Sequence, residues 1–250
     1  MVEQKQNIYF LSDAHLGSLI VEDAREHEMR LVRFLDKIKS DAKAIYLLGD
    51  MFDFWFEYRK VVPKGFVRFL GKIAELSDSG IEIHFFVGNH DMWDFGYFAK
   101  ELGIKVHYEP QKINLGNHRF FIAHGDGLGE KNCGVKLIQW IFHNKVCQFL
   151  FRLFPPYFGL GFGYGWSKSN REQISDQINQ FYGENREFLI QFAKEHEQKE
   201  HMDFYVFGHR HILLDFQLKT KARVVVVGDW YKEFSYAKYD GQTLITEYAE

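Results

Sequence analysis

The sequence is poor in cysteine and has no large excess of charge of either sign. Its 250 residues include only two cysteines, Cys133 and Cys147. If one helix carries both, they lie about four turns apart, which is too far for a disulfide bridge. Two free thiols are typical of a reducing compartment. The formal net charge of −3 gives no support for nucleic-acid binding through a basic surface.

Long hydrophobic runs are also missing. No apolar stretch reaches the roughly 18 residues that a membrane-spanning helix needs. The first six residues are mostly polar, and the apolar run that follows is too short for the hydrophobic region of a signal peptide. The chain shows no internal repeat, low-complexity tract or linker. We therefore expect a single domain over residues 1–250, located in the cytoplasm.

Strand and helix patterns alternate in the first half of the chain. Apolar runs at 8–11, 44–48 and 81–87 predict strands, and apolar residues at helical spacing lie between them. This alternation favours a parallel sheet with helices against its faces. Later strands are separated by Gly116-Asn117 and by Asp240-Gly241, which are typical hairpin turns. The pattern therefore predicts an α/β fold.

Aromatic residues are abundant, at 18% of the chain, and many lie in one segment that interrupts the strand pattern. We expect residues 127–197 to form an inserted helical cap. Its first part, 135–154, is apolar except for a narrow polar stripe, which predicts a helix. A run of aromatics and glycines follows Pro155-Pro156. A second amphipathic helix is then predicted from an apolar face made of Ile174, Ile178, Phe181, Phe188, Leu189 and Phe192.

Five short polar clusters follow apolar runs, each at the carboxyl end of a predicted strand. They are Asp13-Ala14-His15, Gly49-Asp50-Met51-Phe52-Asp53, Gly88-Asn89-His90-Asp91, His124-Gly125-Asp126 and Gly208-His209-Arg210-His211. Taken singly, each is more often a turn, a cap or a buried histidine than a binding site. Ligands of α/β sheets bind outside the carboxyl ends of the strands. Five clusters in this order therefore indicate one shared site.

These clusters supply the side chains that transition-metal ions prefer. The candidate metal ligands are Asp13, His15, Asp50, Asn89, His124, His209 and His211. Asp13 and His15 can face one ion, and Asp50 can bridge two. Imidazole mixed with carboxylate suits manganese, iron or zinc better than calcium or magnesium. Two such ions, roughly 3.5–4 Å apart, activate a water and hold the oxygens of a phosphoryl group. The sequence thus predicts a two-metal phosphoesterase, with Mn²⁺ as the expected metal.

The five clusters resemble, in order, the motifs of the calcineurin-like metallophosphoesterase family. The resemblance covers residues 13–211 and implies a four-layer sandwich of two mixed β-sheets flanked by helices. It implies that Asp13, His15, Asp50 and His211 hold one ion and that Asp50, Asn89, His124 and His209 hold the other. It also implies that His90 acts on the leaving oxygen or the transition state, that Asp91 orients His90, and that Asp53 ties one loop to another.

Within that family, the chain resembles a branch that cleaves the diphosphate of a UDP-linked diacyl sugar in lipid A biosynthesis. The likeness lies in the aromatics after Asp50, in His124-Gly125-Asp126-Gly127-Leu128, in the aromatic cap and in Gly228-Asp229-Trp230. It implies UMP and a diacyl sugar 1-phosphate as products. The expected substrate contacts are Asn89, Asp126, Ser167, Lys168 and Arg171, with Lys131 as a further candidate. One departure is His90, where the best-known hydrolases of this activity have arginine, although histidine is the commoner residue in the wider family.

The apolar cap has two further interpretations. Its aromatics, such as Trp140, Phe142 and Phe149, can line a groove for acyl chains and contact the inner membrane from the cytoplasmic side, or they can form only the core of the cap itself.

Two alternatives to the diacyl-sugar hydrolase stay open. One is a phosphodiesterase or phosphatase for another nucleotide or lipid diphosphate. The other is a binding module without activity, which would be expected to have lost metal ligands.

Overall fold

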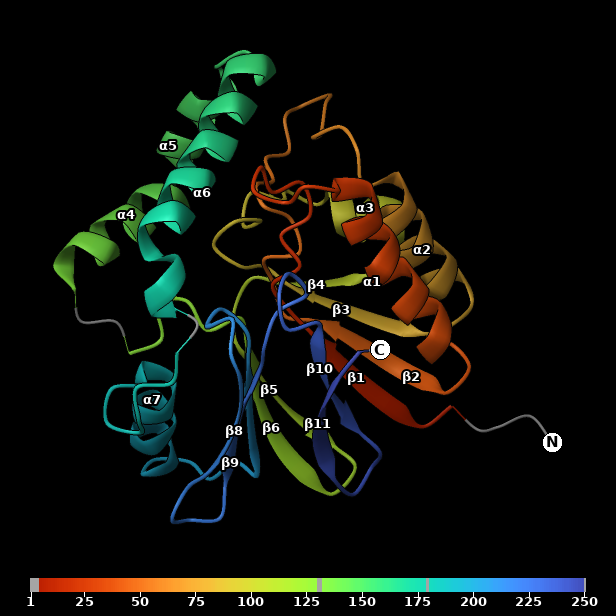
Figure 1. Ribbon diagram of the computed structural model, residues 1–250, viewed down its shortest axis with the longest axis vertical. Helices are drawn as coiled ribbons and strands as arrows, with labels where there is room; N and C mark the ends of the chain where they lie inside the picture. Colours follow the sequence, from red (N-terminus) through yellow and green to blue (C-terminus); the bar gives the residue numbers. More distant parts are fainter. Residues whose placement is uncertain (1–4, 130–131, 179, 250) are drawn as a thin grey trace.

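The strands that precede the polar clusters lie inside two mixed sheets (Figure 1). The computed structural model describes residues 5–129, 132–178 and 180–249, without the side chains of residues 133 and 170–178. The first sheet has the order β11-β10-β1-β2-β3-β4, and β1 to β4 are parallel. Its strands are β1 (Asn7–Leu11), β2 (Ala42–Leu47), β3 (Glu82–Phe86), β4 (Lys105–His107), β10 (Ser235–Tyr239) and β11 (Leu244–Tyr248).

The second sheet has the order β5-β6-β7-β9-β8. Its three central strands β6, β7 and β9 are parallel, and the edge strands β5 and β8 are antiparallel to their neighbours. Its strands are β5 (Gln111–Leu115), β6 (His118–Ala123), β7 (Phe204–Phe207), β8 (Leu213–Gln217) and β9 (Arg223–Val227). The predicted hairpin at Gly116-Asn117 joins β5 to β6, and that at Asp240-Gly241 joins β10 to β11.

Alternating side chains of the strands fill separate cores on the two faces of each sheet. In β1, Tyr9 and Leu11 pack under the helices α1 (Ala24–Ile38), α2 (Val67–Asp78) and α3 (Tyr97–Leu102). Ile8 and Phe10 face the second sheet. The outer face of that sheet packs on α7 (Phe188–Glu197). Helices, sheet, sheet and helix give four layers, so the predicted α/β sandwich of two mixed sheets flanked by helices is confirmed.

The cap segment differs from the prediction in how its helices are divided. The helix expected over 135–154 is two helices, α4 (Cys133–His143) and α5 (Lys145–Arg152). They are separated at Asn144, whose side chain accepts hydrogen bonds from the backbone N–H groups of Val146 and Cys147. Such an amino-terminal cap starts a new helix and stabilises it by about 1 kcal/mol.

The second cap helix was also placed wrongly. Helix α6 (Pro156–Ile178) begins at the proline pair and runs through the aromatic-glycine segment, whereas Phe188 and Leu189 belong to the separate helix α7. Proline is well suited to a first helical position. A side chain at Gly159 would meet the Tyr58 hydroxyl at 2.0 Å, and one at Gly163 would meet the Phe54 ring at 2.4 Å. Glycine is therefore required here because the helix passes so close to these two aromatics.

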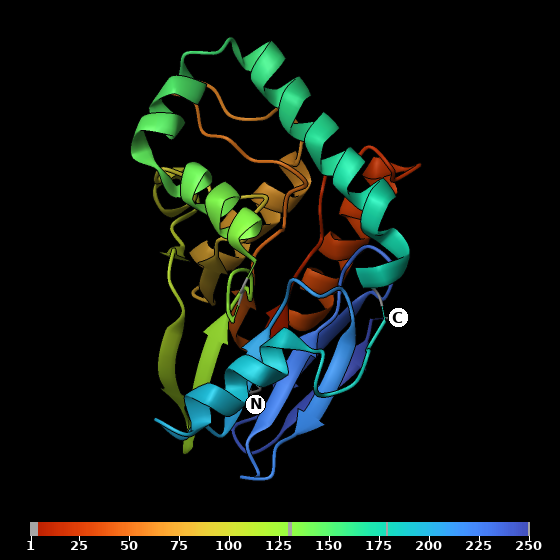
Figure 2. The same cartoon turned by 90° about the vertical axis from the view of Figure 1, so that its left-hand side faces the viewer.

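Helices α4, α5 and α6 form an arch beyond the ends of the strands (Figure 2). The segment after β2, drawn in orange, lies beneath this arch. Helix α7 packs instead on the second sheet. The boundaries 127–197 of the cap, and the single domain 1–250, stay predictions. No helix in the described ranges has both the length and the apolar character to cross a membrane.

Candidate metal centre

The five polar clusters meet at one edge of the fold, where the two sheets come together. Strands β1, β2 and β3 are neighbours in the first sheet, and β6 and β7 are neighbours in the second. Backbone hydrogen bonds tie their loops together: Asp13 N–H donates to the Gly49 carbonyl at 3.0 Å, and Gly208 N–H donates to the His124 carbonyl at 2.9 Å. The loops that carry the predicted ligands are thus held directly against one another.

One group of predicted ligands contains Asp13, His15 and His211. The Asp13 Oδ1 atom lies 3.7 Å from His15 Nε2 and 3.5 Å from His211 Nε2. The two imidazole Nε2 atoms are 3.3 Å apart. Asp13 and His15 are buried and His211 is partly exposed. Three ligand atoms therefore surround one point.

A second group contains Asp50, Asn89, His124 and His209. His124 Nε2 lies 3.4 Å from Asp50 Oδ2, 3.3 Å from Asn89 Oδ1 and 3.2 Å from His209 Nδ1. The same Asp50 Oδ2 atom lies 3.8 Å from His15 Nε2 of the first group. Asp50 therefore stands between the two groups, where a bridging carboxylate would be needed.

The chemistry of these atoms fits divalent cations. Asp13 Oδ1 is buried and has no hydrogen-bond partner among the described residues. His124 Nδ1 lies 2.7 Å from the Leu48 carbonyl oxygen, which can only accept, so Nδ1 carries a proton and Nε2 is the ring nitrogen that faces Asp50. Burial lowers the pKa of His124, but the adjacent Asp50 charge outweighs burial and holds that pKa well above its usual value, so a metal ion at Nε2 would take the place of a proton. Burial, together with His124, holds the pKa of His209 well below its usual value, so His209 is neutral. Lone pairs that face one another in a buried site are unfavourable unless a cation lies between them.

The outer ring nitrogens of two further histidines are also directed by neighbours. His211 Nδ1 lies 3.2 Å from the buried Asp229 carboxylate, and His15 Nδ1 lies 3.7 Å from Asp53 Oδ1. Such partners fix the ring orientation and raise the basicity of the ligand. Asp53 therefore ties the second loop to the first. Asp229 was not identified as a site residue from the sequence, although it follows strand β9 as the other clusters follow theirs.

Five of the seven candidate ligands have a left-handed backbone. Their φ angles are positive at Asp13 (54°), His15 (44°), Asp50 (52°), His209 (66°) and His211 (50°). This conformation is uncommon for residues other than glycine, and it costs on the order of 1–3 kcal/mol for each such residue. Residues of this kind cluster at functional sites. Close approach also requires glycine beside them, because a Cβ at Gly88 would lie 2.2 Å from Asp50 Oδ1. Local strain is thus concentrated where the candidate ligands gather.

His90 lies beside both groups and is oriented by the backbone of Asp53. Its Nδ1 lies 2.7 Å from the Asp53 carbonyl oxygen, so Nδ1–H donates there and Nε2 faces inward. His90 Nε2 is 4.0 Å from Asp50 Oδ2, and the His90 ring stands edge-on to the His15 ring. The side chain is 18% exposed. His90 can therefore reach an oxygen bound at the centre.

The expectation that Asp91 orients His90 is wrong. The buried Asp91 carboxylate accepts hydrogen bonds from the backbone N–H groups of Gly88, at 2.7 Å, and Met51, at 2.8 Å. Burial, with the nearby Asp50 charge, raises the pKa of Asp91 to about 8. Asp91 follows His90 in the sequence, but its carboxylate bonds to the loops after β2 and β3, and His90 Nδ1 bonds to the Asp53 carbonyl instead.

Asp50 keeps its charge in this site. Burial alone would raise the pKa of its carboxyl, but the neighbouring His124 and His90 hold that pKa well below its usual value. The His90 backbone N–H also donates to Asp50 Oδ1 at 2.8 Å. An ionised carboxylate between two groups of imidazoles can bind two cations at once.

An apolar cavity of about 550 Å³ separates the centre from the arch of α4 to α6. Asn89, His90 and His209 line it at the metal centre, and Phe142, Phe151 and other side chains of the arch line the rest. Of the predicted substrate contacts, Asp126 and Ser167 also line this cavity. Lys168 is exposed and is not among the described residues that line it. Lys131 and the side chain of Arg171 lie outside the described residues.

Comparison with known proteins gives the family of this chain. A model described as calcineurin-like phosphoesterase matches residues 6–213. A protein of Porphyromonas gingivalis named UDP-2,3-diacylglucosamine hydrolase is 44% identical over 98% of this chain and 98% of its own length. Proteins with the same name from Aeromonas salmonicida and Haemophilus influenzae are 29% and 27% identical, over 90% and 91% of this chain and 87% and 92% of their own lengths.

Proposed function

The chain belongs to the calcineurin-like phosphoesterase family, and from that premise we propose that it cleaves the diphosphate of UDP-2,3-diacylglucosamine into UMP and 2,3-diacylglucosamine 1-phosphate. The observation that carries the proposal is the 44% identity, over 98% of both chains, to a protein with the corresponding name. The cavity of about 550 Å³ supports it, because its lining is mostly apolar and reaches His90, Asn89 and His209.

We propose that two metal ions occupy the centre. Asp13, His15, Asp50 and His211 would hold one ion, and Asp50, Asn89, His124 and His209 the other. The mixture of imidazoles and carboxylates favours Mn²⁺, with iron and zinc as the alternatives. When bound, such a pair activates a water for attack on phosphorus and neutralises the charge of the phosphoryl oxygens.

His90 would act on the chemistry rather than on metal binding. Because its Nδ1–H is held by the Asp53 carbonyl, a protonated His90 presents Nε2–H to a phosphoryl or leaving oxygen. A positioned acid or base of this kind contributes roughly 10²–10⁴ to the rate. Asp91 would support the loop instead, through its two backbone hydrogen bonds.

The acyl chains of the substrate would occupy the apolar cavity. Each buried CH₂ group contributes about 0.8 kcal/mol, so long acyl chains gain much of their affinity from such a cavity. Asp126 and Ser167 lie along its wall and are proposed to contact the sugar, since both are polar groups in a mostly apolar lining. Lys168 and Arg171 follow on the same helix as candidates for the diphosphate.

We further propose that the arch contacts the cytoplasmic face of the inner membrane. Large apolar side chains of α4 to α6 are exposed, among them Trp140 at 61%, Phe149 at 59% and Phe158 at 64%. Exposed apolar patches of this kind mark contact surfaces, and Lys136 and Lys145 could meet anionic headgroups. Arg152, at the end of the helix that Lys145 begins, lies over the Phe95 ring with its Cζ atom 4.5 Å from the ring centroid.

The reaction is tested by comparing substrates. We expect the purified, Mn²⁺-loaded protein to hydrolyse UDP-2,3-diacylglucosamine much faster than UDP-glucose or dinucleoside polyphosphates, with UMP as a product. Equal rates on acylated and unacylated UDP-sugars would instead favour a general phosphodiesterase.

The metal and membrane proposals are tested separately. Metal analysis after gentle purification should give about two ions per chain. Binding to anionic vesicles should weaken when Phe149 and Phe158 are replaced by serine.

A further inference from the structure

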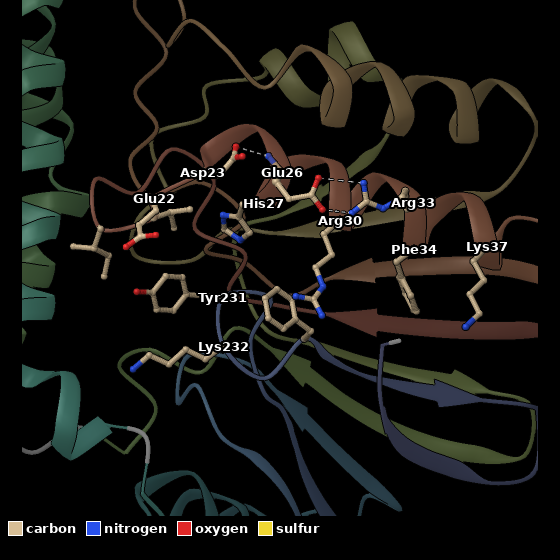
Figure 3. A pocket seen from close by; sticks show the side chains of 13 residues that line it. Glu22, Asp23, Glu26, His27, Arg30, Arg33, Phe34, Lys37, Tyr231 and Lys232 are labelled. Carbon is tan, nitrogen blue, oxygen red and sulfur yellow. Dashed lines mark hydrogen bonds and ion pairs between the residues drawn. The ribbon is translucent and has the colours of Figure 1, made fainter.

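A second large cavity lies along helix α1, away from the apolar one (Figure 3). Its volume is about 730 Å³, within the range of roughly 300–1,000 Å³ that is usual for ligand sites. It is lined by residues 20–23 before α1, by one side of α1 that includes the buried His27 and Phe34, and by Tyr231, Lys232 and Phe234 after β9. None of the candidate metal ligands is among the lining residues. We call this cavity the α1 groove.

The walls of the α1 groove continue two loops of the metal centre. Val21 N–H donates to the Ser18 carbonyl at 3.3 Å, and Ser18 N–H donates to the His15 carbonyl at 3.1 Å. On the other wall, Asp229 Oδ1 accepts the Tyr231 N–H at 3.0 Å while Asp229 Oδ2 lies 3.2 Å from His211 Nδ1. The groove therefore lies on the side of the Asp13, His15 and His211 group. The apolar cavity lies on the side of Asn89 and His209.

The charges of the groove favour an anion, although the whole chain has a net charge of −3. The lining has four cationic and three acidic side chains: Arg30, Arg33, Lys37 and Lys232, and Glu22, Asp23 and Glu26. The acidic ones are partly engaged, because Glu26 forms an ion pair with Arg33 and Asp23 accepts the Glu26 N–H at 2.9 Å as the cap of α1.

Three cations lie outside the Glu26–Arg33 ion pair, and since Lys37 has another interaction, Arg30 and Lys232 are the two that we assign to a ligand. The Arg30 guanidinium lies over the Phe234 ring, 3.5 Å from its centroid, which fixes its plane and leaves its N–H edge open. Figure 3 shows Arg30 pointing from α1 into the groove, toward the side where Tyr231 and Lys232 lie. Neither Arg30 nor Lys232 forms an ion pair with a described residue. A guanidinium held flat beside a lysine is suited to a phosphate group.

Aromatic side chains line the same groove. Tyr231 is partly exposed, its ring lies 6.4 Å from the His27 ring, and Lys232 Nζ is 5.8 Å from the Tyr231 centroid. Exposed aromatic faces next to cations are the usual means of binding a nucleobase, which stacks on the ring while its phosphate meets the charge.

We infer that the α1 groove is a second ligand site, which binds a free nucleoside phosphate with its phosphate at Arg30 and Lys232 and its base against Tyr231. The identity of the nucleotide rests on the proposed function, which releases UMP. None of the candidate metal ligands lines the groove, so released UMP could bind there while a substrate phosphate occupies the metal centre. The groove would thus be a product or effector site, coupled to His211 through the Asp229 loop.

The test is calorimetric titration of the metal-loaded full chain with UMP, uridine and inorganic phosphate. We expect two UMP sites, and we expect Arg30→Gln and Lys232→Gln each to weaken one of them roughly tenfold or more, as for a lost charge-assisted hydrogen bond. Arg30→Lys should weaken it less. Lys219→Gln, in the exposed turn between β8 and β9, is the matched control and should change neither site.

The separate titrations identify the ligand and the reaction. Uridine and phosphate should each bind the groove more weakly than UMP, since each lacks half of the contacts. Noncompetitive inhibition by UMP that is lost in Lys232→Gln supports a free nucleotide. A raised KM for the UDP-linked substrate in the same variant would mean that the groove takes the substrate's own nucleotide. UMP binding that is the same in Arg30→Gln, Lys232→Gln and the wild type would overturn the inference, whether or not the chain hydrolyses UDP-2,3-diacylglucosamine.

Discussion

Replacement of His90 tests whether this side chain acts in catalysis or in metal binding. His90 Nε2 lies only 4.0 Å from Asp50 Oδ2, and His90 also lies near His15 and Asp53 in a group that could hold a cation by itself. Two roles are therefore compatible with its position: a proton donor to the substrate, or an additional ligand. The His90→Ala variant distinguishes them because only the second role requires metal to be lost.

The expected size of the effect follows from the contacts of His90. Its Nδ1 bond to the Asp53 carbonyl is the one hydrogen bond of its ring that the described structure records, and its loss costs about 1 kcal/mol of stability. The lost interaction with a developing negative charge costs more, because a general acid contributes about 2.7–5.4 kcal/mol to lowering the barrier. We therefore predict that kcat falls by roughly 10²–10⁴ while the protein stays folded.

The assay combines steady-state kinetics with metal analysis on the same protein sample. We expect His90→Ala to retain both ions and the wild-type unfolding temperature to within a few degrees. His90→Arg is the informative companion variant, since arginine can donate to a phosphoryl oxygen and should recover part of the rate. If metal content falls in proportion to activity, His90 is a ligand or supports one, and the role argued here is incorrect.

Three other substitutions test the remaining parts of the site. Asp50→Ala should remove both ions and nearly all turnover, since the Asp50 carboxylate stands between the two groups of ligands. Metal analysis and kinetics test this, and two retained ions with a near-normal rate would contradict it. Asp229→Asn should weaken binding of one ion by roughly 10–100-fold in a metal titration, while the other ion is unaffected. Ile138→Asn, in the cavity wall, should lower kcat/KM for the diacyl substrate roughly tenfold but spare bis-p-nitrophenyl phosphate. The exposed neighbour Leu137→Asn is its control.

The candidate ligands could be named from the sequence because their chemistry and their position in the chain agree. Each polar cluster follows a strand, and the carboxyl ends of neighbouring parallel strands meet at one edge. The left-handed backbone of Asp13 and His211 could not be predicted, because a φ angle of this kind is imposed by contacts between distant loops. The pairing of Asp229 with His211 was missed for a similar reason, as it depends on which strands are neighbours.

The cap was predicted less well, because long-range contacts decide its helices. Asn144 carried a local signal, since asparagine is a strong amino-terminal cap, yet the apolar residues on both sides concealed the break. Helix α6 runs through glycines that would weaken an isolated helix. Two of those glycines, Gly159 and Gly163, are explained by Tyr58 and Phe54, which lie more than 90 residues away in the chain and pack against them.

These same contacts connect the cap to the chemistry. Phe54 follows Asp50 and Asp53 in the loop after β2, and it packs on Phe151 and Tyr164 of the arch, with ring centroids 6.4 Å and 6.0 Å away. Trp93, in the loop that carries Asn89 and His90, donates its indole N–H to the Phe142 carbonyl at 2.9 Å.

The loops that carry the candidate ligands therefore also hold the wall of the apolar cavity. A ligand that fills the cavity is positioned relative to Asp50 and His90 through rigid contacts rather than through a flexible linker. Binding energy from acyl chains, which are remote from the reacting phosphorus, can then be used to hold that phosphorus at the metal centre. For this reason, loss of apolar contacts in the arch should lower kcat as well as raise KM, since misplacement of about 1 Å can cost about 10²-fold in rate.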